Sequence, residues 1–517
     1  MPFQATTVAG KILKNSLWYG LETLLETVVF LGTSIAVARY LGPTKLGYFS
    51  YINFFVTIVT RTSGTGMASA TRKYMADFLA QDEPGMARAV YRLAYRYQLL
   101  GICTIALLSL GAVFLFGDPN YRLMSSILVL SIVPGLMSWV PASANQAFED
   151  IAPNTISAVF YILSYGIVIL LTIHFGWDLV GIASALFIGR TVEVILRTIP
   201  LNRKLAAMPL SELDPSVIAQ VRRFCLETIG IQLLMSIVWD RSEMIFLKAY
   251  SGLEQIAFYS VSFGLATNLL VVPRTFGSAT GISLMVEASR DALRVDSIVR
   301  NACRYLLFVA LPVHIGAAAI TRSALGFAYG PKYAAAVPVL AIASLLAIPR
   351  AFQEIPETLI KVADRQKHML YLFILTGALN LGLDWLLIPR YGAVGAALAN
   401  GLSQTFGITA IWQLSRRLFP FKFPVGSALR LSLAAGIMGA GAFFLTHLIP
   451  GLAGIIVAVG VSIPVYAGLV KLFHGLTGDD RLRFDAIGDR LPGALRSPYR
   501  AAIAFATPDP EPEVEPS

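Results

Sequence analysis

The chain has 517 residues, of which 56% are hydrophobic and only 14% are charged. Soluble proteins average about 25% charged residues, so this composition excludes a large soluble domain and favours a membrane protein. The formal net charge is +10, but Lys and Arg gather in the linkers between apolar stretches, which accounts for this charge without a nucleic-acid partner.

Fourteen apolar stretches follow one another along the chain. A bilayer core of about 30 Å requires about 20 apolar residues per helix, and only helices or closed barrels satisfy every backbone polar group in lipid. We therefore predict an all-α polytopic membrane protein with about 14 transmembrane helices. These helices are expected at residues 12–38, 46–69, 93–117, 122–145, 154–175, 179–200, 224–249, 256–284, 302–323, 334–360, 368–389, 392–418, 428–449 and 451–474.

The first apolar stretch is longer than the roughly 7 to 15 apolar residues of a signal peptide, so we expect it to remain as the first helix. The three cysteines, Cys103, Cys225 and Cys303, lie far apart and indicate neither a disulfide framework nor a metal site. The five histidines are equally scattered and are interpreted as packing or interfacial residues. No organic cofactor is predicted.

Positive charge distinguishes the two sets of linkers. One set, which includes both termini, holds 29 Lys and Arg residues, and the other holds seven. Because Lys and Arg accumulate on the cytoplasmic side, both termini are expected in the cytoplasm. The chain after about residue 475 is first basic and then acidic. We predict a disordered cytoplasmic tail over 476–517, whose arginines suit an anionic membrane surface.

The ends of the first and seventh helices have similar sequences, RYLGPTKLGYFS at 39–50 and AYSGLEQIAFYS at 249–260. At an offset of 210 residues they share several positions, including Gly42 and Gly252. Both segments would face the same side of the membrane, which indicates a parallel repeat. The predicted domains are two pseudo-symmetric six-helix bundles and two extra helices before the tail, at 1–210, 211–420 and 421–475.

Three segments resemble those of one transporter family: ARYLGPTKLGYFSY after the first helix, YGPKYAAAVPVLAIASLLAIP at the tenth, and NLGLDWLLIPRYGAVGAALANGLS across the eleventh and twelfth. The chain resembles the polysaccharide-flippase branch of the multidrug/oligosaccharidyl-lipid/polysaccharide exporter superfamily over about residues 10–475. The resemblance implies a V-shaped pair of six-helix bundles plus two extra helices.

The same resemblance implies a function and a location. The substrate would be an undecaprenyl-pyrophosphate-linked oligosaccharide, or a similar lipid-linked glycan, moved from the cytoplasmic to the outer leaflet of a bacterial inner membrane. Such transport would serve the synthesis of lipopolysaccharide or exopolysaccharide. The implied partners are the lipid-linked glycan, membrane lipids and other polysaccharide-assembly proteins.

Two arginines are expected deep within apolar helices. Arg61 lies about 15 residues into the second helix and Arg274 about 18 into the eighth, at near-equivalent positions of the repeat. A charge in mid-helix costs about 2.5 to 3.5 kcal/mol on insertion, so each is a candidate functional residue. Together they would form a fork for a pyrophosphate, and the resemblance favours this because such flippases tend to have cationic cavities. Alternatively, each arginine pairs with a buried carboxylate and only holds helices together.

Glu22 and Glu26 are four residues apart and share one face of the first helix. A buried carboxylate binds a proton more readily than an exposed one, so either residue is a candidate proton carrier. Either is also a candidate counter-charge for Arg61. The related lipid II flippases often have arginine in this helix, and this chain does not.

Four oxygen-bearing side chains are expected at similar depth in the second bundle. They are Asp240 on the seventh helix, Asn380 and Asp384 on the eleventh, and Asn400 on the twelfth. Hard cations such as sodium select oxygen ligands, and the resemblance implies that the same three helices bind a cation. The predicted coupling ion is sodium or a proton, and no other metal is expected. Alternatively, Asp240 pairs with Arg241 and the amides only join helices.

Two other classes of function stay open. A cation-coupled multidrug exporter of the same superfamily should have an apolar and acidic cavity, whereas Arg61 and Arg274 favour an anionic substrate. A membrane enzyme such as a glycan polymerase or ligase would need a sizeable outer loop, and the longest outer linker has about ten residues. We therefore prefer a flippase without enzymatic activity that works by alternating access with ion coupling.

Overall fold

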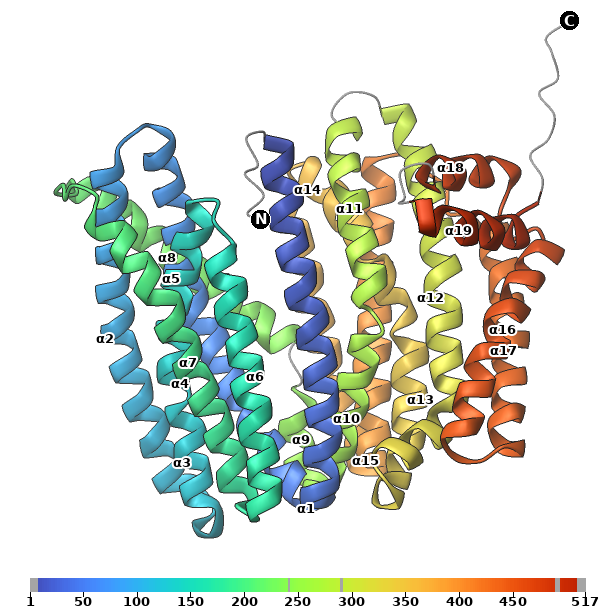
Figure 1. Cartoon of the computed structure of the whole chain (residues 1–517), viewed down its shortest axis with the longest axis horizontal. Helices are drawn as coiled ribbons and strands as arrows, with labels where there is room; N and C mark the ends of the chain where they lie inside the picture. Colours follow the sequence, from blue (N-terminus) through green and yellow to red (C-terminus); the bar gives the residue numbers. More distant parts are fainter. Residues whose placement is uncertain (1–7, 240–241, 289–291, 489–492, 509–517) are drawn as a thin grey trace, which may run out of the picture. The chain divides into compact units, whose positions relative to one another are not determined.

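The computed structural model describes residues 8–239, 242–288, 292–488 and 493–508 (Figure 1). Throughout these residues the regular secondary structure is helical. The chain forms two compact units, Met1–Lys248 with Gly252–Ala257, and Ala249–Ser251 with Phe258–Ser517. The first unit thus extends past the sequence-based boundary at 210/211, because α8 (Pro215–Trp239) packs against α1 (Val8–Ala80).

The remaining helices up to the boundary between the units differ widely in length. In chain order they are α2 (Pro84–Phe116), η1 (Pro119–Tyr121), α3 (Arg122–Leu130), α4 (Ile132–Met137), α5 (Trp139–Ala147), α6 (Ala152–Phe175), α7 (Asp178–Ala206) and α9 (Glu243–Tyr250).

The second unit contains the rest of the helices and begins within α10. They are α10 (Leu253–Asn268), α11 (Val271–Ala288), α12 (Ala292–Ala328), η2 (Pro331–Ala336), α13 (Val337–Leu346), η3 (Ile348–Phe352), α14 (Glu354–Val362), α15 (Gln366–Leu418), α16 (Val425–Leu448), α17 (Gly451–Leu472), α18 (Gly478–Gly488) and α19 (Gly493–Ala506).

Ten helical segments of the described residues are long and apolar enough to cross a membrane, or eleven if the bent pair α10 and α11 forms one span. The predicted count of 14 is not confirmed. Part of the difference arises because α1 and α15 each run through two of the expected helices. Within each of them the backbone departs from helical geometry at one residue, Gly42 with φ of 70° or Gly392 with φ of 54°.

Backbone features recur at about the offset of the sequence repeat. Gly42 has φ of 70° and Gly252 has φ of 88°, a region of φ that glycine adopts without the steric cost of a side chain. This requirement explains why glycine occupies both matched positions. Likewise η1 begins at Pro119 and η2 begins at Pro331. These correspondences support the proposed parallel repeat.

A bend precedes Arg274. Pro273 has no backbone N–H to donate to the carbonyl of Leu269, so a regular helix cannot continue through this turn. The chain breaks between α10 and α11, and their axes differ by 42°.

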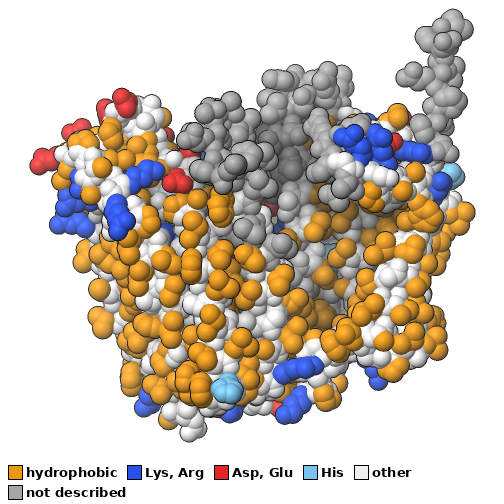
Figure 2. Space-filling model, viewed as in Figure 1, with side chains coloured by type: hydrophobic (Ala, Val, Ile, Leu, Met, Phe, Trp, Pro, Cys, Tyr) orange, Lys and Arg blue, Asp and Glu red, His pale blue; other side chains and the backbone are white. Residues whose placement is uncertain are grey.

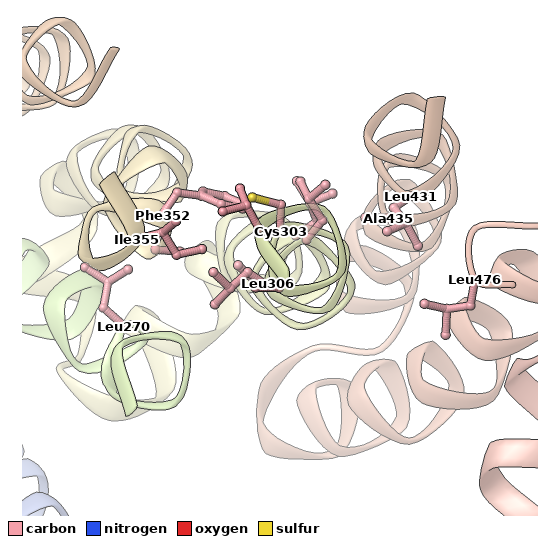
Figure 3. Close-up of a cluster of buried hydrophobic side chains, with 14 of the residues drawn as sticks. Leu270, Cys303, Leu306, Phe352, Ile355, Leu431, Ala435 and Leu476 are labelled. Atoms are coloured by element: carbon pink, nitrogen blue, oxygen red, sulfur yellow. The ribbon is translucent and has the colours of Figure 1, made fainter. Parts of the chain in front are cut away.

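Each unit has a buried apolar core and an apolar outer face. In the first unit, Met75 of α1 packs with Val90 of α2 and Leu201 of α7. In the second, α12 is central to a cluster that includes Leu270, Cys303, Leu306, Phe352, Ile355, Leu431, Ala435 and Leu476 (Figure 3). Large side chains such as Leu115 of α2 are exposed, and Figure 2 shows mainly hydrophobic side chains along the helices, with Lys and Arg near their ends. Such apolar faces suit a lipid environment.

The first part of the tail is folded, contrary to the predicted disorder over 476–517. Asp480 in the first turn of α18 is fully buried and accepts hydrogen bonds from the backbone N–H (2.8 Å) and hydroxyl (2.9 Å) of Thr477. It also forms an ion pair with Arg304 (2.7 Å) and accepts from the Tyr305 hydroxyl (2.7 Å). These contacts attach α18 to α12. Residues 509–517 lie outside the described part.

Candidate functional site

A cavity of about 490 Å³ lies within the first unit, between α1, α4, α5 and α7. One polar face of α1 lines it, because a spacing of three or four residues places side chains on the same side of a helix. The lining residues of this face are Asn53, Val56, Thr57, Thr60, Arg61, Thr65, Ala68, Ser69 and Arg72. The segments opposite contribute Ser131, Gly135, Ser138, Trp139, Ala142, Ser143, Gln146, Leu186, Arg190, Glu193 and Arg197.

Positive charge predominates in this cavity. Four arginines, Arg61, Arg72, Arg190 and Arg197, line it together with one carboxylate, that of Glu193. The other polar lining residues are neutral hydroxyls and amides. The cavity therefore favours an anionic ligand.

Glu193 lies between two of these arginines on the same helix. Its carboxylate is 2.8 Å from the guanidinium of Arg190 and 2.8 Å from that of Arg197, because the three residues follow a spacing of three and four on α7. Arg197 is buried and also donates to the hydroxyls of Ser138 (2.6 Å) and Ser157 (3.0 Å). Arg190 is more exposed and lies over the ring of Tyr161 at 4.3 Å. Arg190, Glu193 and Arg197 thus form a local ion-pair network on α7.

Arg61 and Arg72 are exposed at the surface of α1 that lines the cavity. Arg72 donates to the side-chain oxygen of Gln146 on α5 (3.2 Å). Arg61 thus lines the cavity of the first unit. The guanidinium groups of both residues can reorient toward a ligand more easily than that of buried Arg197.

Arg274 belongs to the second unit, on α11, and is partly buried. The charge of Glu354, on α14, acts on it. A carboxylate near Arg274 is what the alternative interpretation requires, in which the arginine only holds helices together through an ion pair. Arg61 and Arg274 lie in different units, and the pyrophosphate fork between them stays a prediction.

The two glutamates of the first expected helix both lie on α1. The side chain of Glu22 is outside the described part. Glu26 is exposed, and its charge acts on Arg190 of α7. A role for Glu26 as a counter-charge therefore concerns Arg190 as well as Arg61.

Two of the four predicted cation ligands, Asn380 and Asp384, contact each other in the second unit, and Ser403 links Asn380 to the backbone of the third, Asn400. On α15, the Asn380 amide donates to Asp384 (3.1 Å). The Ser403 hydroxyl lies 2.7 Å from the Asn380 side-chain oxygen and 2.9 Å from the Asn400 backbone carbonyl, and it has one proton to share between these two acceptors. All four residues are buried. The fourth predicted ligand, Asp240, lies outside the described residues. Across the described residues, no group of three or more His, Cys, Asp or Glu could hold a metal ion.

Several cavity residues were not predicted from the sequence. By sequence, Arg72 and Arg197 belong to the basic linkers, and Trp139 is one aromatic residue among many in an apolar stretch. A recurring pattern could have identified the α1 face: polar residues at 53, 57, 60, 61, 65, 69 and 72 lie at helical spacing in or just after an otherwise apolar stretch. For Arg197, the signal was an acidic residue four positions earlier.

The fold and the site define an all-α polytopic membrane protein with a cationic cavity in its first unit. A family model described as polysaccharide biosynthesis protein matches residues 12–288, which is more than half of the chain. The chain therefore belongs to the polysaccharide biosynthesis protein family. No curated protein sequence matches it significantly.

Solved structures of membrane transporters resemble the chain in fold. The lipid II flippase MurJ in an inward closed conformation has a TM-score of 0.72 at 15% identity, over 89% of this chain and 99% of that one. An inward-facing multidrug resistance MATE family transporter has a TM-score of 0.64 at 14% identity, over 76% and 94%. A transporter from Pyrococcus furiosus, whose binding pocket is described as having reverse polarity, has 0.56 at 15% identity, over 79% and 95%.

Proposed function

We propose that the chain is a flippase that moves an undecaprenyl-pyrophosphate-type lipid-linked oligosaccharide from the cytoplasmic to the outer leaflet for polysaccharide biosynthesis. The observation that carries this proposal is the cavity of the first unit, with four arginines and one glutamate inside a membrane protein. Family membership and the MurJ-like fold support it. A cationic drug would be repelled by the same lining.

The arginines supply the chemistry that a pyrophosphate needs. Each guanidinium presents several N–H donors in a plane, which matches the oxygens of a phosphate group. Exposed Arg61 and Arg72 would contact the anion directly. Buried Arg197 holds Glu193, and Glu193 in turn holds Arg190, so this trio keeps Arg190 at the cavity wall. Binding and release through alternating access need no covalent step, so we propose no enzymatic activity.

Ion coupling is proposed for the buried polar cluster of the second unit. Asp384, Asn380 and Asn400 offer one carboxylate and two amides, which are oxygen donors of the kind that sodium selects. The side-chain oxygen of Asn380 accepts a hydrogen bond from the Ser403 hydroxyl. A cation that binds this oxygen would replace that hydrogen bond. Asp240 is proposed as a further ligand from the sequence.

The experiment is a transport assay in proteoliposomes. It uses a fluorescent short-chain lipid-pyrophosphate-linked sugar, with ethidium as a cationic-drug comparison. We expect the wild-type chain to move the lipid-pyrophosphate and not ethidium. Arg61→Ala should weaken its binding about 10- to 100-fold, because charge-assisted hydrogen bonds contribute about 1.5–3 kcal/mol. Arg61→Lys should restore part of the loss, since it keeps the charge but not the fork.

A matched control is Arg39→Ala, which removes an exposed arginine of the same helix that does not line the cavity. Its transport should equal that of the wild type. Arg274→Ala tests the second proposed ligand: loss of transport with unchanged melting temperature supports binding, and a lower melting temperature supports a structural pair with Glu354. Export of ethidium without movement of any lipid-pyrophosphate would replace this proposal with a multidrug exporter.

A further inference from the structure

We propose that the cavity of the first unit contains a saccharide subsite, formed by Trp139 and the hydroxyls of Thr57, Thr60 and Thr65, which binds the sugar attached directly to the pyrophosphate. This inference rests on the proposed function and assigns a second part of the same cavity. All four residues line the cavity together with the arginines.

The direction of the threonine hydrogen bonds is the first argument. Each of the three hydroxyls donates its only proton to the helix carbonyl four residues earlier: Thr57 to Asn53 (2.7 Å), Thr60 to Val56 (2.7 Å) and Thr65 to Arg61 (2.5 Å). A hydroxyl whose proton is used in this way offers only lone pairs. Toward the cavity these three groups therefore act as acceptors.

An acceptor cannot bind the oxygens of an ionised pyrophosphate, which carry no proton to donate. The arginines bind that part of the ligand, since they only donate. The threonines instead fit a ligand group rich in O–H or N–H donors. A sugar with its hydroxyls, or an N-acetyl sugar with its amide, has this property and is bonded directly to the phosphate in a lipid-linked glycan.

Trp139 supplies the second argument. A sugar ring has a face of C–H groups, which are attracted to the electron-rich face of an aromatic ring. The indole packs against Gly64 of α1, where a Cβ would lie only 2.7 Å from Cδ2 of the indole. The absence of a side chain at Gly64 thus permits the close approach that holds the indole beside the threonine face. Trp139 is partly exposed and lines the cavity.

The cavity has the volume that a sugar ring needs. Gly135 of α4 lies close to Thr60, since a Cβ there would be 3.8 Å from Cγ2 of Thr60, and both residues line the cavity. The cavity volume of about 490 Å³ is within the range of small-ligand pockets, about 300 to 1,000 Å³. It can hold a pyrophosphate together with one sugar.

The test measures binding to the purified full-length chain in lipid nanodiscs. The probes are farnesyl pyrophosphate and its conjugates with glucose, galactose, N-acetylglucosamine or N-acetylgalactosamine. We expect at least one conjugate to bind about tenfold more tightly than farnesyl pyrophosphate itself. Thr57→Val and Thr60→Val should each reduce this preference about 3- to 10-fold, which corresponds to one lost hydrogen bond.

Thr71→Val is the matched control, because Thr71 is on the same helix and makes the same bond to the carbonyl four residues earlier (2.7 Å), but does not line the cavity. It should keep the full preference. Trp139→Phe should lower the preference less than Trp139→Ala. Since the threonine variants keep the fold of the helix, the result does not depend on whether Trp139→Ala folds.

The outcomes separate the subsite from the proposed function. If every conjugate binds no more tightly than farnesyl pyrophosphate, or if the threonine variants weaken all probes equally, the saccharide subsite is wrong and the anion site stands. If neither farnesyl pyrophosphate nor any conjugate binds, the proposed function itself is wrong.

Discussion

Arg197 and Arg61 line the same cavity but have different surroundings. Arg197 is 7% exposed and is held by Glu193 and by the hydroxyls of Ser138 and Ser157. Removal of one partner of such a buried ion pair costs about 3–5 kcal/mol, so Arg197 contributes to the stability of α7 against α5 and α6. Arg61 is exposed on α1. The effect of its charge should therefore be seen mainly in ligand binding.

At the same scale, Asp384 is the residue on which the proposed ion coupling depends. It is fully buried, and Asp384→Asn keeps its shape while it removes the charge. We expect the sodium affinity measured from transport rates to fall about 10- to 100-fold, because bonds to charged groups contribute about 1.5–3 kcal/mol. Transport should respond less to an imposed sodium gradient.

Asp364→Asn serves as the control for this substitution, since Asp364 is exposed. Unchanged transport by Asp384→Asn, with the same response to sodium and pH gradients, would contradict the ion site. If sodium affects neither the wild type nor Asp384→Asn, and the response to pH is lost in Asp384→Asn, the coupling ion is a proton.

At the scale of elements, the attachment of α18 shows how local sequence can oppose overall composition. Thr477 and Asp480 form a capping pair at the start of α18, in which the Asp480 carboxylate accepts from the Thr477 backbone N–H. The same carboxylate neutralises Arg304 of α12. Its four contacts satisfy a fully buried charge, and they tie the helix to the membrane-spanning part of the second unit.

We predict that Asp480→Asn detaches α18 from α12, and that α19, which packs against α18, loses part of its support. The substitution leaves Arg304 without its ion-pair partner, at a cost of about 3–5 kcal/mol. Hydrogen exchange of residues 478–506 should accelerate, and limited proteolysis should cut there first. Asp479→Asn, one position earlier and exposed, should leave both measurements unchanged. Protection retained in Asp480→Asn would show that apolar contacts alone hold the segment.

The limits of sequence-based prediction follow from particular residues. Arg61 was recognised because a charge is conspicuous in an apolar stretch. Arg197 and Arg304 lie near the ends of such stretches, where a charge is common, so their burial depends on partners that only the fold reveals. The composition of the tail predicts disorder, whereas the TGDD motif at 477–480 is a local sign of a helix start. Part of the difference in helix count arises because a glycine turn can join two spans without an intervening loop.

At the scale of the whole molecule, orientation decides from which side the cavity receives its ligand. The sequence predicts cytoplasmic termini from 29 basic residues in one set of linkers against seven in the other. Two of the 29, Arg197 and Arg304, are ion-paired and buried, so their positions reflect packing rather than membrane orientation. The remaining excess is still large enough for the positive-inside rule to apply.

Cysteine labelling tests this orientation. In a background with Cys103, Cys225 and Cys303 replaced by alanine, Glu212→Cys places a thiol between α7 and α8, and Asn120→Cys places one in η1. Both positions are exposed. A membrane-impermeant maleimide added to intact spheroplasts should label Asn120→Cys at once and Glu212→Cys only after permeabilisation, because Glu212 belongs to the basic set of linkers. The reverse pattern would place the termini outside and would rule out uptake of a lipid-linked glycan from the cytoplasmic leaflet by the proposed route.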